Sequence, residues 1–174
     1  MIRFEFEDEI FYYVRGRFTD EHFMTLNETK QKQVSNFYFG TVDYKSMCME
    51  ALFEFIKETK NANAIYITKD ACEHFLQTFN DRSYIKQILP LLSSSYRLMH
   101  LPEKAADLEN DYPFSIYGTT AYCTSVAAAY CDLREYNIAL KIVKKVNAMH
   151  GNFNGEKTEL SVVYDRIRKE SGLE

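Results

Sequence analysis

The sequence predicts an all-α protein of antiparallel helix-pair repeats, preceded by a short N-terminal β-hairpin or extended arm. Residues 2–18 alternate between apolar and polar side chains, whereas from residue 19 onwards the apolar residues follow the period of helices. The segments LSSSYRLM, VAAAYCDL and LSVVYDRI share one pattern, and their tyrosines, Tyr96, Tyr130 and Tyr164, follow one another at intervals of 34 residues. A fixed period of this length indicates a repeated helix pair.

The composition of the 174-residue chain limits the classes of function. Hydrophobic residues make up 46%, which is enough for a core, and the net charge of −4 argues against direct nucleic-acid binding. The acidic N-terminal stretch does not resemble a secretory signal, and we find no apolar run long enough to span a membrane. We therefore expect a cytoplasmic protein with free cysteines, and the oligomeric state stays open.

The first predicted domain, residues 1–18, is the hairpin or arm. Ile2, Phe4 and Phe6 share one face of a strand, and a turn at residues 7–9 would return the chain. The alternative is an irregular arm whose aromatic side chains pack on the helices.

Helices are predicted from residue 19 to residue 172, the second predicted domain. Asp20 is the expected N-cap of a first helix that ends at Gly40, and Thr68 the expected N-cap of a later one. Pro90 either kinks its helix or marks its start. The further helices are expected at residues 43–61, 69–80, 83–100, 102–111, 119–135, 137–150 (stopped by Gly151) and 155–171.

Residues 123–146, CTSVAAAYCDLREYNIALKIVKKV, carry the clearest copy of the pattern. Val126, Ala127 and Tyr130, with Ala139 nine residues later, resemble the tetratricopeptide repeat family. The upstream copy has Leu92, Ser93, Tyr96 and Ala105, and it departs from the family at Pro102, Glu109 and Pro113. The resemblance implies a tetratricopeptide-like α-solenoid with repeats at 86–119 and 120–153 and a capping helix at 155–171. A generic helical bundle with coincidental tyrosines is the alternative.

Catalytic and metal-binding patterns are absent from the sequence. Cys72 and His74 are two residues apart on a predicted helix, so their side chains point in nearly opposed directions. We find neither metal-ligand spacing nor a glycine-rich phosphate loop. The chain is therefore expected to have no catalytic activity, no cofactor and no metal.

The resemblance also implies where a ligand would bind, because first helices of tetratricopeptide pairs line a concave groove. The binding residues it implies here are Arg97, Thr124, Cys131 and Asp132, and further groove positions are Ser94, Ala128 and Val162. Thr124 and Ala128 differ from the lysine and asparagine that chaperone-tail binders use. A protein or peptide partner, helical or apolar, is expected, unless residues 2–18 fill the groove.

A second resemblance gives an alternative function. Ala139 and Leu140, then Glu159, Leu160, Tyr164 and Ile167, are similar to the end of bacterial transcriptional-activation domains, although the loop between them lacks that family's Gly-x-x-Pro. This resemblance implies a regulatory sensor module.

The cysteines give the first testable prediction. Cys123 and Cys131 are eight residues apart on one predicted helix, about 12 Å along its axis, which exceeds disulfide reach. Thiol titration of fresh protein under denaturing, non-reducing conditions should find four thiols, and two or fewer would contradict the prediction.

Overall fold

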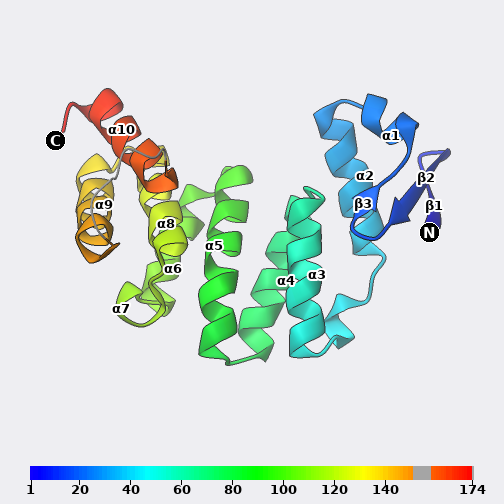
Figure 1. Cartoon of the computed structure of the whole chain (residues 1–174), viewed down its shortest axis with the longest axis horizontal. Helices are drawn as coiled ribbons and strands as arrows, with labels where there is room; N and C mark the ends of the chain where they lie inside the picture. Colours follow the sequence, from blue (N-terminus) through cyan, green and yellow to red (C-terminus); the bar gives the residue numbers. More distant parts are fainter. Residues whose placement is uncertain (151–157, 174) are drawn as a thin grey trace. The chain divides into compact units, whose positions relative to one another are not determined.

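The structure is a computed structural model that describes residues 1–150 and 158–173 (Figure 1). The predicted stop at Gly151 and residues 155–157 of the predicted capping helix lie outside the described residues. The described part is mostly helical, with a small antiparallel sheet at the N-terminus, as predicted. Contacts divide the chain into two compact units, Met1–Asn80 and Asp81–Glu174, and the predicted border at residues 18/19 falls inside the first.

Unit 1 begins with a three-stranded sheet whose order is β1-β2-β3. The strands are β1 (Ile2–Phe6), β2 (Glu9–Val14) and β3 (Arg17–Phe18). The predicted hairpin is confirmed, with Phe6 opposite Glu9 across a two-residue turn. Both turn residues, Glu7 and Asp8, have positive φ (50° and 63°), which suits the right-handed twist of a hairpin without the usual glycine. The third strand was not predicted.

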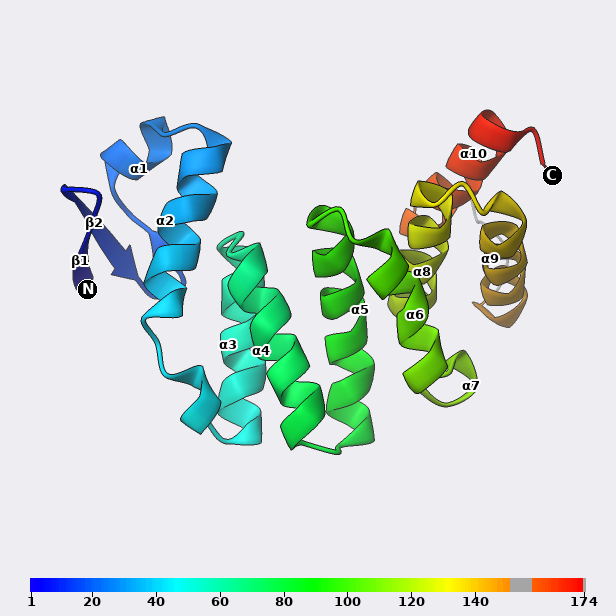
Figure 2. The same cartoon turned by 180° about the vertical axis from the view of Figure 1, so that it is seen from behind.

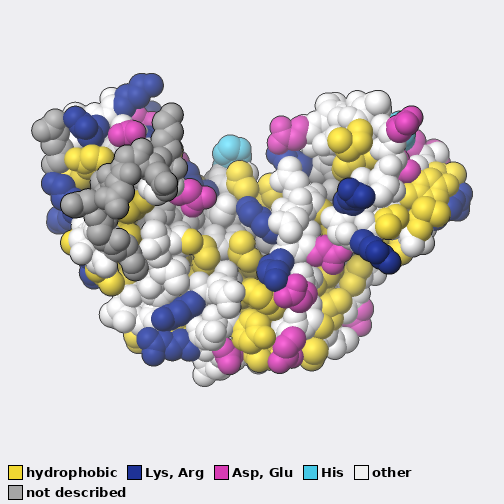
Figure 3. All heavy atoms as spheres, viewed as in Figure 1, with side chains coloured by type: hydrophobic (Ala, Val, Ile, Leu, Met, Phe, Trp, Pro, Cys, Tyr) yellow, Lys and Arg dark blue, Asp and Glu magenta, His cyan; other side chains and the backbone are white. Residues whose placement is uncertain are grey.

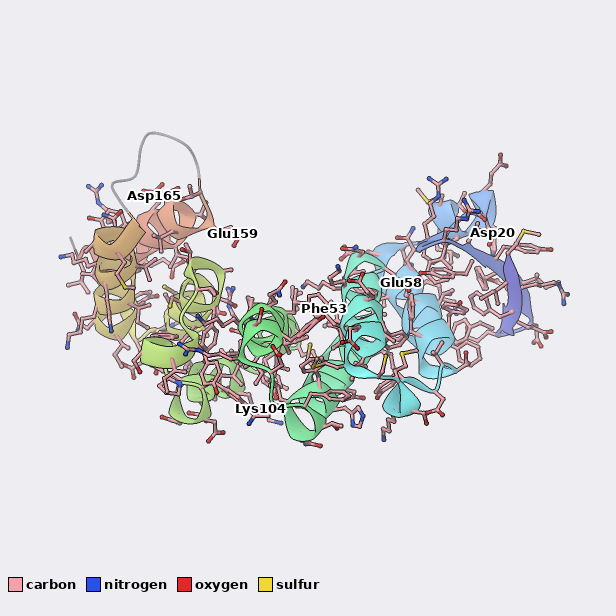
Figure 4. The ribbon with its side chains drawn as sticks, turned by 60° about the horizontal axis from the view of Figure 1, so that its bottom comes forward. Asp20, Phe53, Glu58, Lys104, Glu159 and Asp165 are labelled. Atoms are coloured by element: carbon pink, nitrogen blue, oxygen red, sulfur yellow. The ribbon has the colours of Figure 1, made fainter. Side chains whose placement is uncertain are left out.

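One tyrosine ring joins this sheet to the helices of unit 1. Tyr38 of α2 (Glu28–Gly40) lies 5.0 Å from the ring of Phe4, 4.5 Å from Tyr13 and 5.9 Å from Phe18. Aromatic pairs at such separations contribute about 0.5–1.5 kcal/mol each beyond their buried area. Tyr13 also donates a hydrogen bond to Glu58, labelled in Figure 4. The inner face of the sheet is therefore part of the core of unit 1.

The first helix of unit 1 begins where it was predicted, but the later helix boundaries differ from those predicted. One helix was expected from residue 21 to Gly40, but the structure has two, α1 (Glu21–Thr25) and α2. The Asn27 side chain accepts a hydrogen bond from the Lys30 amide and so caps the start of the second helix. Asp20 is the N-cap residue of α1 by position, as predicted, but its carboxylate does not bond to the helix, because it accepts from the Tyr12 amide at 2.5 Å. A 3₁₀ turn, η1 (Tyr44–Ser46), then precedes α3 (Met49–Asn61).

Thr68, in contrast, is not the N-cap of its helix. The helix α4 spans Ile65–Thr78, and the hydroxyl of Thr68 is buried inside it, 3.0 Å from both the Thr59 hydroxyl and the Ala64 carbonyl. The prediction failed because a buried threonine can satisfy its hydroxyl on the preceding turn of its own helix.

Within its described residues, 81–150 and 158–173, unit 2 contains helices and connecting turns but no strand. Its helices are α5 (Arg82–Leu98), α6 (Pro102–Asp111), α7 (Phe114–Tyr117), α8 (Thr120–Asp132), α9 (Tyr136–His150) and α10 (Glu159–Ser171). The helix α8 is central, because it contacts α5, α6, α9 and α10. Pro90 lies inside α5, whose start is instead capped by Asp81, so Pro90 does not mark the helix start.

Three helix pairs are joined by turns of the same construction: α3–α4, α5–α6 and α8–α9 (Figures 1 and 2). The middle residue of each turn, Asn63, His100 or Arg134, has a φ of about 60°. In each turn the next residue donates its amide to a carbonyl five residues earlier, Thr59, Tyr96 or Tyr130 respectively. This is the Schellman arrangement, which satisfies helix-end carbonyls and reverses the chain.

The patterned residues of unit 2 lie at the helix contacts. Leu92, Val126 and Leu160 are buried, as are Ser93, Ala127, Ala105 and Ala139. The tyrosines differ, since Tyr96 is buried while Tyr130 and Tyr164 are partly exposed. The fully buried tyrosine of α8 is instead Tyr122, whose hydroxyl donates to the Tyr112 carbonyl at 3.0 Å.

The burial of Ala139 gives a test of the α8–α9 contact. Ala139→Leu should destabilise the protein by about 1–3 kcal/mol, because its fully buried position has no room for a longer side chain. The matched control is Ala121→Leu on the exposed side of α8, which should change stability by less than about 0.5 kcal/mol. Denaturant melts measure both, and equal melting of the two variants would contradict the assigned packing.

Candidate functional site

A polar cluster connects three helices of unit 2. The carboxylate of Asp132, the last residue of α8, accepts from Arg97 of α5 (Nε to Oδ2, 2.7 Å) and from Arg166 of α10 (Nη1 to Oδ1, 2.6 Å). Both ion pairs are sheltered, since each of the three side chains is about a third exposed or less. A carboxylate at a helix C-terminus is disfavoured by the helix dipole, and the two arginines offset this cost.

The cluster continues along α10. Arg166 also donates from Nε to Oε1 of Glu170 at 2.9 Å, and the hydroxyl of Tyr136, the first residue of α9, donates to Oε2 at 2.9 Å. We call Arg97, Asp132, Tyr136, Arg166 and Glu170 the arginine cluster. Its charges form a chain of alternating sign, so each charged group has an opposite neighbour.

The ionisation of the cluster follows from these contacts. Partial burial would raise the pKa of Asp132, but the hydrogen bonds from Arg97 and Arg166 outweigh burial and hold this pKa below its ordinary value. The hydrogen bond from Arg166, and then that from Tyr136, lower the pKa of Glu170. The hydrogen bond to Glu170 raises the pKa of the Tyr136 hydroxyl. At neutral pH both carboxyl groups are therefore ionised and the phenol is protonated.

A recess of about 640 Å³ lies against the arginine cluster. It is lined by Cys131, Asp132, Arg134, Tyr136, Arg166 and Glu170. The charges of its lining balance, with two arginines and two carboxylates, and Arg134 stands at the left-handed position of the α8–α9 turn. The surface can offer guanidinium donors, carboxylate acceptors and the edge of a phenol ring to a ligand.

The four binding residues implied by the resemblance occupy two different environments. Arg97 and Asp132 are brought together in the arginine cluster, whereas Thr124 and Cys131 are 4% and 1% exposed. Of the further groove positions, Ala128 is buried, Ser94 is partly exposed and Val162 is exposed. Residues 2–18, the alternative occupant of the groove, form the sheet of unit 1.

Three residues of the cluster were missed by the sequence reasoning: Tyr136, Arg166 and Glu170. A signal was present, because Arg166 follows Asp132 by 34 residues and Glu170 follows Tyr136 by 34. Residues one period apart on neighbouring helix pairs are candidates for contact, and opposite charges at that offset mark an ion pair.

The cysteines are all free, as predicted. Cys72, Cys123 and Cys131 are buried, and burial raises the pKa of each thiol, that of Cys123 to about 11. These thiols stay protonated at neutral pH, which makes them poor nucleophiles. Cys48 is exposed, because it precedes α3 as its N-cap residue.

A second, smaller hollow of about 250 Å³ lies in unit 1, lined by Tyr44, Lys45, Asp70, Glu73, His74 and Gln77. Its acidic residues are held by Lys69, whose Nζ lies 2.6 Å from Asp70 and 3.5 Å from Glu73. Within residues 1–150 and 158–173, histidine, cysteine and carboxylate side chains nowhere gather in threes that could hold a metal ion. The described helices are also too short or too polar to cross a membrane.

Comparison with known proteins identifies no relative of the chain, since no family model, curated protein or solved structure matches it.

The ion pairs of Asp132 predict how stability depends on pH. Because its pKa is lower in the folded than in the unfolded chain, its stabilisation is present above the ordinary value of 3.8 and is lost as the pH falls through the folded value. Asp132→Asn should cost about 1 kcal/mol at pH 7, and the difference from wild type should shrink towards pH 3. Denaturant melts across this range measure the effect.

The control is Asp165→Asn, which removes an exposed carboxylate of α10 outside the cluster (Figure 4). It should stay within about 0.5 kcal/mol of wild type at each pH. Equal pH dependence of both variants would show that the arginine cluster does not stabilise the fold.

Proposed function

We propose that the helical part of the chain is a tetratricopeptide-like repeat scaffold that binds a protein or peptide partner and catalyses no reaction. Each of the three helix pairs is joined by a Schellman turn. In the two pairs of unit 2, the carbonyl groups that accept the turn hydrogen bonds belong to Tyr96 and Tyr130, which are 34 residues apart. Polar contacts recur at the same offset, as in Asp132–Arg166, Tyr136–Glu170 and the Arg82–Ile116 hydrogen bond. Both regularities are expected of stacked helix pairs.

One observation carries the binding proposal: the recess is built by side chains that come from the last helix pair and from the helix that follows it. Asp132 and Tyr136 belong to α8 and α9, and Arg166 and Glu170 to α10. A ligand here would contact several elements at once, as peptides do in helical grooves. The recess is too open and too polar to resemble a closed apolar site for a small molecule.

The chemistry of the recess favours a particular kind of peptide. Arg134 is exposed and carries a guanidinium group that can form a bidentate contact with a carboxylate. The Tyr136 ring can pack against an aliphatic or aromatic side chain. We infer that the partner presents an acidic side chain next to an apolar one. The arginine cluster holds this surface rigid, which reduces the entropy lost on binding.

A random-peptide phage library tests the proposal directly. Peptides selected on the wild-type chain should combine an acidic and an apolar residue, and Arg134→Ala should weaken their binding by about tenfold, as for loss of one charged hydrogen-bonded contact. The double variant Arg97→Ala with Asp132→Ala should weaken it as well. Titration calorimetry measures affinity, and circular dichroism confirms that the variants are folded.

Lys169→Ala is the matched control, because Lys169 is an exposed cation of α10 that does not line the recess. Its binding should equal that of wild type. Peptides that lose no affinity in the folded Arg134→Ala variant would place binding elsewhere, and a selection that enriches no peptide would contradict the scaffold function.

A further inference from the structure

The outer edge of the sheet in unit 1 carries an inference that is independent of the proposed peptide site. We propose that a second copy of this chain pairs its β1 with β1 of the first, antiparallel and with Phe4 opposite Phe4. The two three-stranded sheets would then form one six-stranded sheet. The argument rests on the hydrogen-bonding direction of β1, on its charge pattern and on the apolar side chains beside it.

The free backbone groups of β1 belong to Arg3 and Glu5. A two-residue turn makes its flanking residues, Phe6 and Glu9, a hydrogen-bonded pair. Because hydrogen-bonded and non-hydrogen-bonded pairs alternate along an antiparallel ladder, Phe4 and Ile2 also belong to hydrogen-bonded pairs with β2. The intervening residues Arg3 and Glu5 therefore point their N–H and C=O groups away from β2.

The partner of Arg3 across the ladder confirms this direction. The Tyr12 carbonyl accepts from the Thr19 amide at 3.2 Å, and the Tyr12 amide donates to Asp20. Both backbone groups of Tyr12 thus face away from β1, as a non-hydrogen-bonded pair requires. Arg3 and Glu5 are exposed, and among the described residues neither has a hydrogen-bond or ion-pair partner outside β2. An edge of this kind is a template for another strand.

The charges of β1 select the partner and the register. With Phe4 opposite Phe4, Arg3 of each copy faces Glu5 of the other, which gives two opposite-charge pairs. A shift that places Arg3 opposite Arg3, or Glu5 opposite Glu5, puts like charges together and is destabilising. A one-residue slip would place apolar side chains opposite charged ones. The strand is therefore complementary to itself in a single antiparallel register.

The same register satisfies the backbone and the apolar face. Arg3 and Glu5 would exchange their free N–H and C=O groups, while Phe4–Phe4 and Ile2–Phe6 would form the closer non-hydrogen-bonded pairs.

Apolar surface is available for this contact. Ile2 is 53% exposed, and Phe37, whose ring lies 4.9 Å from that of Phe6, is 43% exposed. Figure 3 shows hydrophobic side chains gathered at the end of unit 1 that carries β1 and β2. A second copy would cover part of this surface, which the single chain leaves in water.

Sedimentation equilibrium of the full chain tests the proposal. Wild type should form a concentration-dependent dimer, and Arg3→Glu or Glu5→Arg should each raise its dissociation constant by about tenfold or more, because two opposite-charge pairs become like-charge pairs. An equimolar mixture of the two variants should regain the dimer, since each strand then faces the opposite charge. Circular dichroism checks that each variant is folded.

Arg17→Glu is the control, because it makes the same charge change on β3 at the other edge of the sheet. It should dimerise like wild type. A chain that stays monomeric at hundreds of micromolar would overturn the proposal and leave the edge to a strand of another protein. A dimer that neither single variant weakens, or variants whose mixture does not recover association, would place the interface elsewhere.

Discussion

The helix pairs depend on one constraint, which is that a single residue of each connecting turn adopts the left-handed conformation. Asn63, His100 and Arg134 occupy this position, and the turn amides then reach back to the last carbonyls of the preceding helix. The conformation costs about 1–2 kcal/mol for a residue with a β-carbon. Packing of each pair offsets that cost, and the direction of the second helix follows from the turn. The central position of α8 and the meeting of Asp132 with Tyr136 near one recess are consequences of this geometry.

Elements with strong periodicity could be predicted from the sequence, and so could the N-terminal hairpin. The alternation of Ile2, Phe4 and Phe6 indicated a strand, and Leu92, Val126 and Leu160 indicated buried helix positions. Helix ends were less predictable, because a polar side chain has several possible partners. Asp20 and Thr68 fit the pattern of N-caps, yet one bonds to a strand amide and the other lies inside its helix. Only the folded arrangement decides between such partners.

The candidate site could be predicted in part. Arg97 and Asp132 were placed on corresponding helices, and the structure pairs them at 2.7 Å. Arg166 was not predicted to be part of the site. An arginine side chain is long, so the neighbour that it reaches depends on how closely the helices pack. Thr124 and Cys131 were assigned to a groove through the resemblance to tetratricopeptide repeats; both are buried, although Cys131 contributes to the lining of the recess. The positions of residues along a helix indicate which of them share a face. They do not indicate whether a neighbouring helix packs closely on small residues of that face and buries it.

The uneven exposure of the four cysteines has a practical consequence. Three thiols are buried and held in the protonated form, whereas Cys48 stands in solvent before the first turn of α3. An alkylating reagent applied to the folded chain at neutral pH should therefore attach to this one position. The native sequence thus already provides a single attachment point for a fluorophore or spin label in unit 1, without any engineered substitution.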